Sequence, residues 1–177
     1  ALSHQPIDQW MRTMAMISLA GVADVYNMNL PHNLQLYVHP EDNKVLVFPW
    51  DNDHAFYHLS TSPLLGSLAT TNLSKIIDLP HNRRMFYGHL LDLINTSYNT
   101  TVLAPFIENY TRLTKFETLE TFFNNYINNR VDFVLSELDN VAPQIPFEIT
   151  TNNGEDFEAS NTIVTIEGDG WIDVHEI

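Results

Sequence analysis

The chain contains no cysteine and few basic residues. The lack of cysteine excludes disulfides, zinc–thiolate sites and thiolate catalysis, and it leaves the redox compartment open. Only 8 lysines and arginines stand against 22 aspartates and glutamates, a net charge of −14. Such a surface repels phosphate backbones, so we expect no nucleic-acid binding. No apolar run approaches the roughly 20 residues of a membrane-spanning helix, and no membrane span is expected.

Charge is distributed unevenly along the chain. Residues 1–141 carry 14 acidic and 8 basic residues, whereas residues 142–177 carry 8 acidic and no basic ones. The two prolines in residues 142–146 favour an extended linker. We therefore expect a first unit at 1–141, a linker at 142–146, and the start of a second domain at 147–177. The chain begins Ala-Leu-Ser-His, without a signal-like run, which indicates a piece of a longer protein.

The first unit reads as mostly helical around one β-hairpin. Apolar residues recur at helical spacing, which predicts helices at 7–20, 83–94, 102–114 and 119–138. Gly21 is placed to end the first helix. Two apolar runs, 34–39 and 44–49, are joined by Pro-Glu-Asp-Asn and predict a hairpin. The fold class is therefore predicted to be α+β.

The segment after the linker alternates apolar and polar residues at period two. This pattern predicts strands at 147–151, 162–166 and 171–174, separated by turns at 153–154 and 168–170. The spacing is typical of a β-sandwich, but three strands are too few to complete one. We expect the beginning of a β-sandwich-like domain that is cut short.

Polar residues flank the predicted hairpin. A hairpin brings its two ends together, so Asn33 and Asp51 should lie at its open end. Their side-chain oxygens suit a hard divalent cation such as Mg²⁺. Asp24 lies in the loop before Asn33 and can reach the same place. This order of Asp, Asn, hairpin and Asp is the layout of protein-kinase active sites, in which Mg²⁺ neutralises ATP phosphates.

Two segments of the hairpin region stand out, Asn-Leu-Gln-Leu-Tyr at 33–37 and Pro-Trp-Asp-Asn-Asp-His-Ala-Phe at 49–56. With these segments the chain resembles the spore coat protein H (CotH) kinase family, and the resemblance extends over roughly residues 7–139. It implies the C-terminal lobe of an atypical protein-kinase-like fold that transfers phosphate from ATP to Ser or Thr of a protein substrate. It also implies that Asp24 is the catalytic-loop aspartate and that Asn33 and Asp51 bind ATP-bound Mg²⁺. Asp53 shares the motif as a further metal ligand.

The sequence departs from a complete kinase in one respect. It shows no nucleotide-covering loop, and its three lysines are Lys44, in the hairpin turn, and Lys75 and Lys115, after the metal motif. A kinase lysine that pairs with ATP phosphates comes before the catalytic loop. We therefore expect the catalytic half without its ATP-binding half, and a chain that is inactive alone.

Other interpretations stay open. Asp51 and Asp53 can form an Asx turn, and Asp24 can cap a loop. An EF-hand is excluded because Phe56 and Ser62 stand where that loop needs Gly and Glu. The rival function is a non-catalytic extracellular structural or adhesion module, and a third is regulatory binding of nucleotide or metal. Acidic character, absent cysteine and the β appendage favour export from a bacterial cell.

Overall fold

The computed structural model describes residues 6–26, 32–66, 72–116, 118–160 and 162–174. The helices are α1 (Pro6–Leu19), α2 (Ser74–Ile77), α3 (Pro80–Thr96), α4 (Thr100–Thr114), α5 (Thr118–Val141) and the 3-10 helix η3 (Thr151–Gly154). The strands are β1 (Leu34–Val38), β2 (Val45–Pro49), β3 (Glu148–Ile149) and β4 (Gly168–Asp169). The fold is α+β, as predicted, with a mostly helical unit and two small antiparallel sheets.

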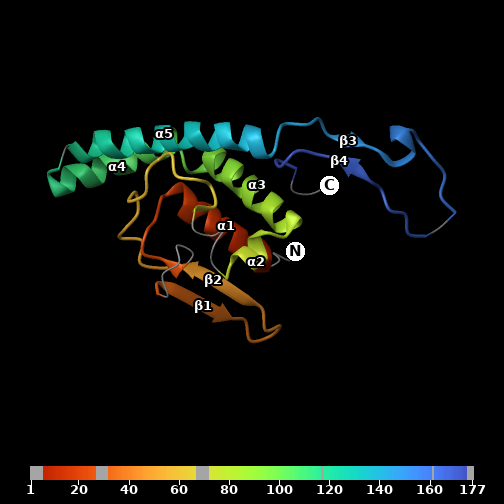
Figure 1. Cartoon of the computed structure of the whole chain (residues 1–177), viewed down its shortest axis with the longest axis horizontal. Coiled ribbons are helices and arrows are strands. Elements are labelled where there is room, and N and C mark those ends of the chain that lie inside the picture. Colours follow the sequence, from red (N-terminus) through yellow and green to blue (C-terminus); the bar gives the residue numbers. More distant parts are fainter. Residues whose placement is uncertain (1–5, 27–31, 67–71, 117, 161, 175–177) are drawn as a thin grey trace.

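The helical unit is layered. Figure 1 shows the hairpin below α1, with α3 lying alongside and above α1 and the antiparallel pair α4 and α5 on top. The core lies between α1, α3 and α5. Its buried members are Met11, Met14, Ala15, Leu19, Leu64, Leu73, Ile77, Phe86, Leu90, Leu91, Leu93, Ile94, Val134, Leu138 and Ile172.

The end of α1 is set by Gly21. This glycine has a φ of +56°, a left-handed conformation that costs glycine little. The Val22 N–H donates to the Ile17 carbonyl at 3.2 Å, and the Gly21 N–H donates to the Ser18 carbonyl at 3.2 Å. These two bonds form a Schellman motif, which ends a helix by satisfying its last carbonyls. The predicted end at Gly21 is confirmed, and part of the loop that follows, at 27–31, lies outside the described residues.

The second sheet corrects the predicted strands. The strand predicted at 162–166 is wrong, because β3 pairs with Gly168–Asp169, which we had predicted to be a turn. A Cβ on Gly168 would lie 2.6 Å from the Glu148 carbonyl oxygen. The missing side chain thus permits the close approach that pairing requires.

The strand predicted at 171–174 is also wrong, because this segment is a turn that packs on the helical unit. Ile172 is 4% exposed and belongs to the helical core. The Trp171 indole N–H donates to the Ala142 carbonyl at 2.6 Å, and Arg84 of α3 donates to the carbonyls of residues 170, 171 and 174. A guanidinium, not a neighbouring strand, therefore satisfies this backbone.

Candidate functional site

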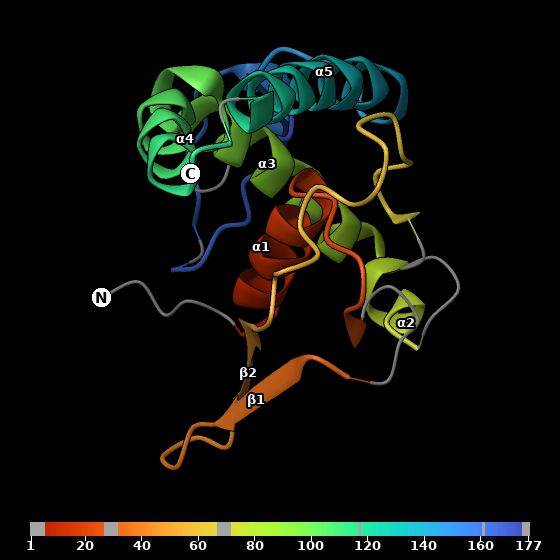
Figure 2. The ribbon, with the colours of Figure 1, turned by 90° about the vertical axis from the view of Figure 1, so that its left-hand side faces the viewer.

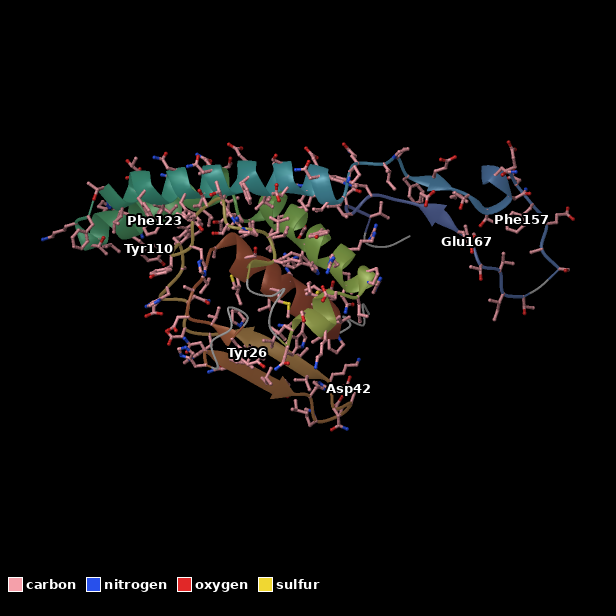
Figure 3. The ribbon with its side chains drawn as sticks, in the orientation of Figure 1. Tyr26, Asp42, Tyr110, Phe123, Phe157 and Glu167 are labelled. Carbon is pink, nitrogen blue, oxygen red and sulfur yellow. The ribbon has the colours of Figure 1, made fainter. Side chains whose placement is uncertain are left out.

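The hairpin places Asn33 and Asp51 at its open end. β1 and β2 pair antiparallel, from Leu34 opposite Pro49 to Val38 opposite Val45. Asn33 directly precedes the first pair, and Asp51 follows Pro49 by two residues. The predicted hairpin is confirmed. Figure 3 shows Asp42 at the other, closed end.

The open end lies beside the loop that follows α1 because α1 holds the hairpin by its side chains. The Trp10 indole N–H donates to the Val45 carbonyl at 2.8 Å. The Gln9 amide forms hydrogen bonds with both backbone groups of Val47. β2 is thus tied to α1 along its length.

Asn33 joins the candidate catalytic loop directly. Its Nδ2 donates to the backbone carbonyl of Asp24 at 2.7 Å. The Asp24 carboxylate is 2.8 Å from His32 Nε2, and both side chains are partly exposed. Because Nδ2 is the donor, Asn33 Oδ1 is the atom of this amide that can bind a cation. The structure therefore brings the side chain of Asn33 and the backbone of Asp24 together.

The segment after β2 runs back along the end of α1. The Ala23 N–H donates to the His54 carbonyl at 3.0 Å, and the Phe56 N–H donates to the Ala20 carbonyl at 2.6 Å. Gly21 accepts from the next two amides, at 3.2 and 3.1 Å. Figure 2 shows this part of the chain passing α1 on its way toward α5. The Asp51–His54 segment is thereby fixed beside the residue that precedes Asp24.

Asp53 occupies the outer side of the cluster. Its side chain is 68% exposed, and its Oδ2 lies 4.0 Å from His54 Nε2. An exposed pair at this distance contributes little to stability. Asp53 is thus a largely solvent-exposed carboxylate.

The predicted residues share an uncommon backbone conformation. Asp24, Asn33 and Asp51 have φ values of 61°, 54° and 55°. Among residues with a side chain, Asp and Asn adopt positive φ most readily. The backbone thus gives a reason for these residue types that is independent of any ligand.

The donor chemistry nevertheless fits Mg²⁺. Mg²⁺ is usually bound by one or two carboxylates together with phosphate and water oxygens, rather than by a protein cage. Asn33 Oδ1 and the Asp51 carboxylate are such oxygens. Among the residues whose placement is described, no group of three His, Cys, Asp or Glu forms a complete metal cage. A cation held by these two oxygens would need its further ligands from water or from a bound molecule.

A small apolar hollow of about 20 Å³ lies beside Asn33. It is lined by Trp10, Thr13, Met14, Ile17, Val25, Tyr26, Asn33, Leu34, Val47, Phe48, Pro49, Trp50 and Leu73. This lining contains no lysine or arginine. Lys44 Nζ instead pairs with Asp42 at 3.0 Å, at the closed end of the hairpin. The hollow has room for about one water molecule and offers no cation for a triphosphate.

Sequence reasoning missed Arg130 of α5. This arginine is 1% exposed and donates to the backbone carbonyls of Ser18, Ser60 and Ser62. It lies four residues after Tyr126 and four before Val134, which are both buried. A charged residue on the buried stripe of a helix was the available signal, because such a residue needs partners in the core.

Comparison of the chain with protein-family models found no match, and comparison with curated proteins found none. No helix in the described part of the chain is long and apolar enough to cross a membrane. The resemblance to the CotH kinase family therefore rests on the residues at 33–37 and 49–56 alone.

Proposed function

We propose that this chain is the catalytic-loop half of a CotH-like atypical protein kinase, which transfers phosphate from ATP to Ser or Thr of a protein substrate. The observation that carries the proposal is the hydrogen bond from Asn33 Nδ2 to the Asp24 carbonyl. It ties the loop aspartate to the residue that heads β1, while the hairpin returns Asp51 to the same end. Phosphoryl transfer needs such converging carboxylate and amide groups more than it needs a nucleophile.

Each residue takes a separate role in the proposed reaction. Asn33 Oδ1 and Asp51 hold Mg²⁺, with Asp53 as an additional ligand, and the bound ion supplies charge neutralisation at the phosphates. Asp24 orients the acceptor hydroxyl and takes its proton, and His32 holds the Asp24 carboxylate in place. The bond from the acceptor oxygen to the γ-phosphorus forms as the bond to the β,γ-bridging oxygen breaks, and ADP leaves.

The proposal requires groups that bind the ATP phosphates and that come from outside these 177 residues. A lysine must neutralise the triphosphate, and the hollow beside Asn33 has none. We place that lysine and a nucleotide-covering loop on another part of the protein. Export from a bacterial cell belongs to the same proposal, on the acidic composition and the small second sheet.

The test uses the longer protein that includes the upstream sequence. Mg²⁺-dependent transfer of labelled phosphate from ATP to acceptor proteins is measured for the wild type, Asp24→Asn and Asp51→Asn. Asparagine keeps the tolerance for positive φ and removes the charge. Asp42→Asn is the matched control, because it lies at the closed end of the same hairpin. Loss of transfer in the first two variants only, with circular dichroism unchanged, supports the proposal.

The rival function is a non-catalytic structural or adhesion module. The positive φ at Asp24, Asn33 and Asp51 favours it, because turn geometry alone accounts for these residue types. A folded wild type that neither binds ATP nor transfers phosphate would support this module. Mg²⁺-dependent ATP binding without turnover would instead indicate a regulatory binding domain.

A further inference from the structure

Arg130 is the bulkiest of the fully buried side chains in the described residues. Its NH1 donates to the Ser60 carbonyl at 3.0 Å and also to the Ser62 carbonyl. Its NH2 lies 3.1 Å from the Ser18 carbonyl and 3.2 Å from Ser18 Oγ. One side chain of α5 therefore joins the end of α1 to the chain that follows the Asp51–His54 segment.

The acceptors of this guanidinium are neutral. Within the described ranges, no carboxylate forms an ion pair with Arg130 among the pairs found. Burial lowers the pKa of Arg130, because it disfavours the charged form. An apolar residue of similar volume would avoid this desolvation cost. What an apolar residue cannot do is hold three separate carbonyls in one arrangement.

Neighbouring side chains of α5 hold the same loop. The Phe56 ring packs against Phe123 at 5.0 Å and edge-on against Tyr126 at 5.2 Å between ring centroids. Phe56 itself has a φ of 61°, which is uncommon for a bulky residue and persists only where surrounding contacts fix it. The loop is thus held from one side by α5 and from the other by the end of α1.

The path from Arg130 to the candidate ligands is short and continuous. Ser18 Oγ also donates to the Leu64 carbonyl at 2.6 Å. The amides of residues 56–58 donate to the carbonyls of Ala20 and Gly21, and His54 accepts from Ala23. These contacts fix the loop after β2 against the end of α1, and the Ala23–His54 bond fixes it against the loop that carries Asp24. Without the hydrogen bonds from Arg130 to the Ser60 and Ser62 carbonyls, α5 no longer holds this end of the loop after β2.

We propose that Arg130 is a positioning residue that sets the placement of the Asp51–His54 segment against the loop carrying Asp24. Its importance for metal binding rests on the proposed function, whereas its effect on the loop does not. Arg130 touches no proposed ligand and acts through the backbone of residues 54–62.

The experiment follows two readouts on the full chain. Mn²⁺ binding, measured by electron paramagnetic resonance, reports the metal site, and hydrogen exchange of the Ala23 amide reports its bond to His54. The variants are Arg130→Lys, Arg130→Met and Ser18→Ala, all compared at a temperature where circular dichroism shows them folded. Asp51→Asn tests the metal site itself. Arg112→Met is the matched control, because Arg112 is an exposed arginine of α4.

We expect Arg130→Met to speed Ala23 exchange and to weaken Mn²⁺ binding about tenfold, the lower end of the range for residues that support metal ligands. Arg130→Lys and Ser18→Ala should shift both readouts less, in the same direction, and Arg112→Met should change neither. Should Arg130→Met fail to fold, the other two variants decide. Unchanged Ala23 exchange and Mn²⁺ binding in those folded variants would overturn the inference. If Asp51→Asn binds Mn²⁺ like the wild type, the metal site fails, and Ala23 exchange alone decides the role of Arg130.

Discussion

The side-chain amide of Gln9 pairs with the backbone of Val47 as a neighbouring strand would. The Val47 N–H donates to Gln9 Oε1 at 3.1 Å, and Gln9 Nε2 donates to the Val47 carbonyl. Val47 is 6% exposed, so its backbone groups have little access to water. One helical side chain thereby satisfies the edge of β2 and holds the hairpin on α1.

Replacing Gln9 by alanine should lower the free energy of unfolding by about 1–3 kcal/mol, because the Val47 N–H and carbonyl lose their partner in a buried place. Urea denaturation measures the change. Gln35→Ala is the control, since Gln35 is exposed on β1 and should change stability little. Equal stabilities for the two variants would show that the Gln9 pair does not hold the hairpin.

Gly21→Ala should lower stability by about 2–3 kcal/mol, through the positive φ and the overlap of the added methyl group. A Cβ at this position would lie 2.1 Å from the Tyr126 hydroxyl oxygen. Thermal denaturation followed by circular dichroism gives the loss. The double variant Gly21→Ala/Tyr126→Phe separates the two causes, because it removes the overlapping oxygen and leaves the φ cost. A double variant no more stable than Gly21→Ala would contradict the steric part.

Tyr126→Phe alone should leave stability unchanged or raise it slightly. The Tyr126 hydroxyl is buried without a hydrogen-bond partner in the described part of the chain, and burial raises its pKa. Removing an unsatisfied polar group from the interior relieves its desolvation cost. Chemical denaturation of the single variant tests this, and a clear loss of stability would mean that the hydroxyl has a partner.

Asp42 should titrate below its ordinary pKa of 3.8, because hydrogen bonding to Lys44 favours its charged form. A folded-state pKa below the unfolded one means that the carboxylate contributes fully above about pH 4, and that this contribution is lost as the pH falls through the folded value. Carbon-detected NMR of Asp42 and the amide shift of Lys44 should follow the same curve. Lys44→Met should return the midpoint toward 3.8. A midpoint that stays where it was would assign the shift to another cause.

Ile172→Ala should destabilise the helical unit by about 2–4 kcal/mol, as expected for a buried isoleucine that leaves a cavity. Ile172 is 4% exposed, and Ile163 in the same acidic segment is 85% exposed. Ile163→Ala is therefore the matched control and should be neutral. If Ile172→Ala leaves the unfolding of α1, α3 and α5 unchanged, the packing of residues 170–174 on the helices does not persist in solution.

The hairpin and the long helices could be predicted because their signals are local. The apolar period of α1 and the stop at Gly21 lie within one short stretch, as do the two runs that form β1 and β2. The second sheet could not be predicted in the same way. Residues 168–169 pair with Glu148–Ile149 because Gly168 has no side chain, and the alternating residues 162–166 form no strand.

The same distinction between local and long-range signals applies to the candidate site. The meeting of Asn33 and Asp51 at one end of a hairpin follows from the turn between the strands, which the sequence shows. The bond from Asn33 to the Asp24 carbonyl depends on backbone angles that the sequence does not show. Arg130 reaches Ser18 across 112 positions of the chain, so its partners could not be inferred from spacing.

The left-handed backbone at positions 24, 33 and 51 also governs how relatives of this protein can diverge. Asp, Asn and Gly adopt this backbone conformation most readily. Substitutions at these three positions should therefore be limited to these three residue types, whether or not a reaction depends on them. A change from Asp to Asn at position 51 is the informative substitution, because it preserves the loop conformation and removes the negative charge. On the proposed function, a lineage that makes this exchange freely keeps the loop and loses the negative charge proposed to bind Mg²⁺.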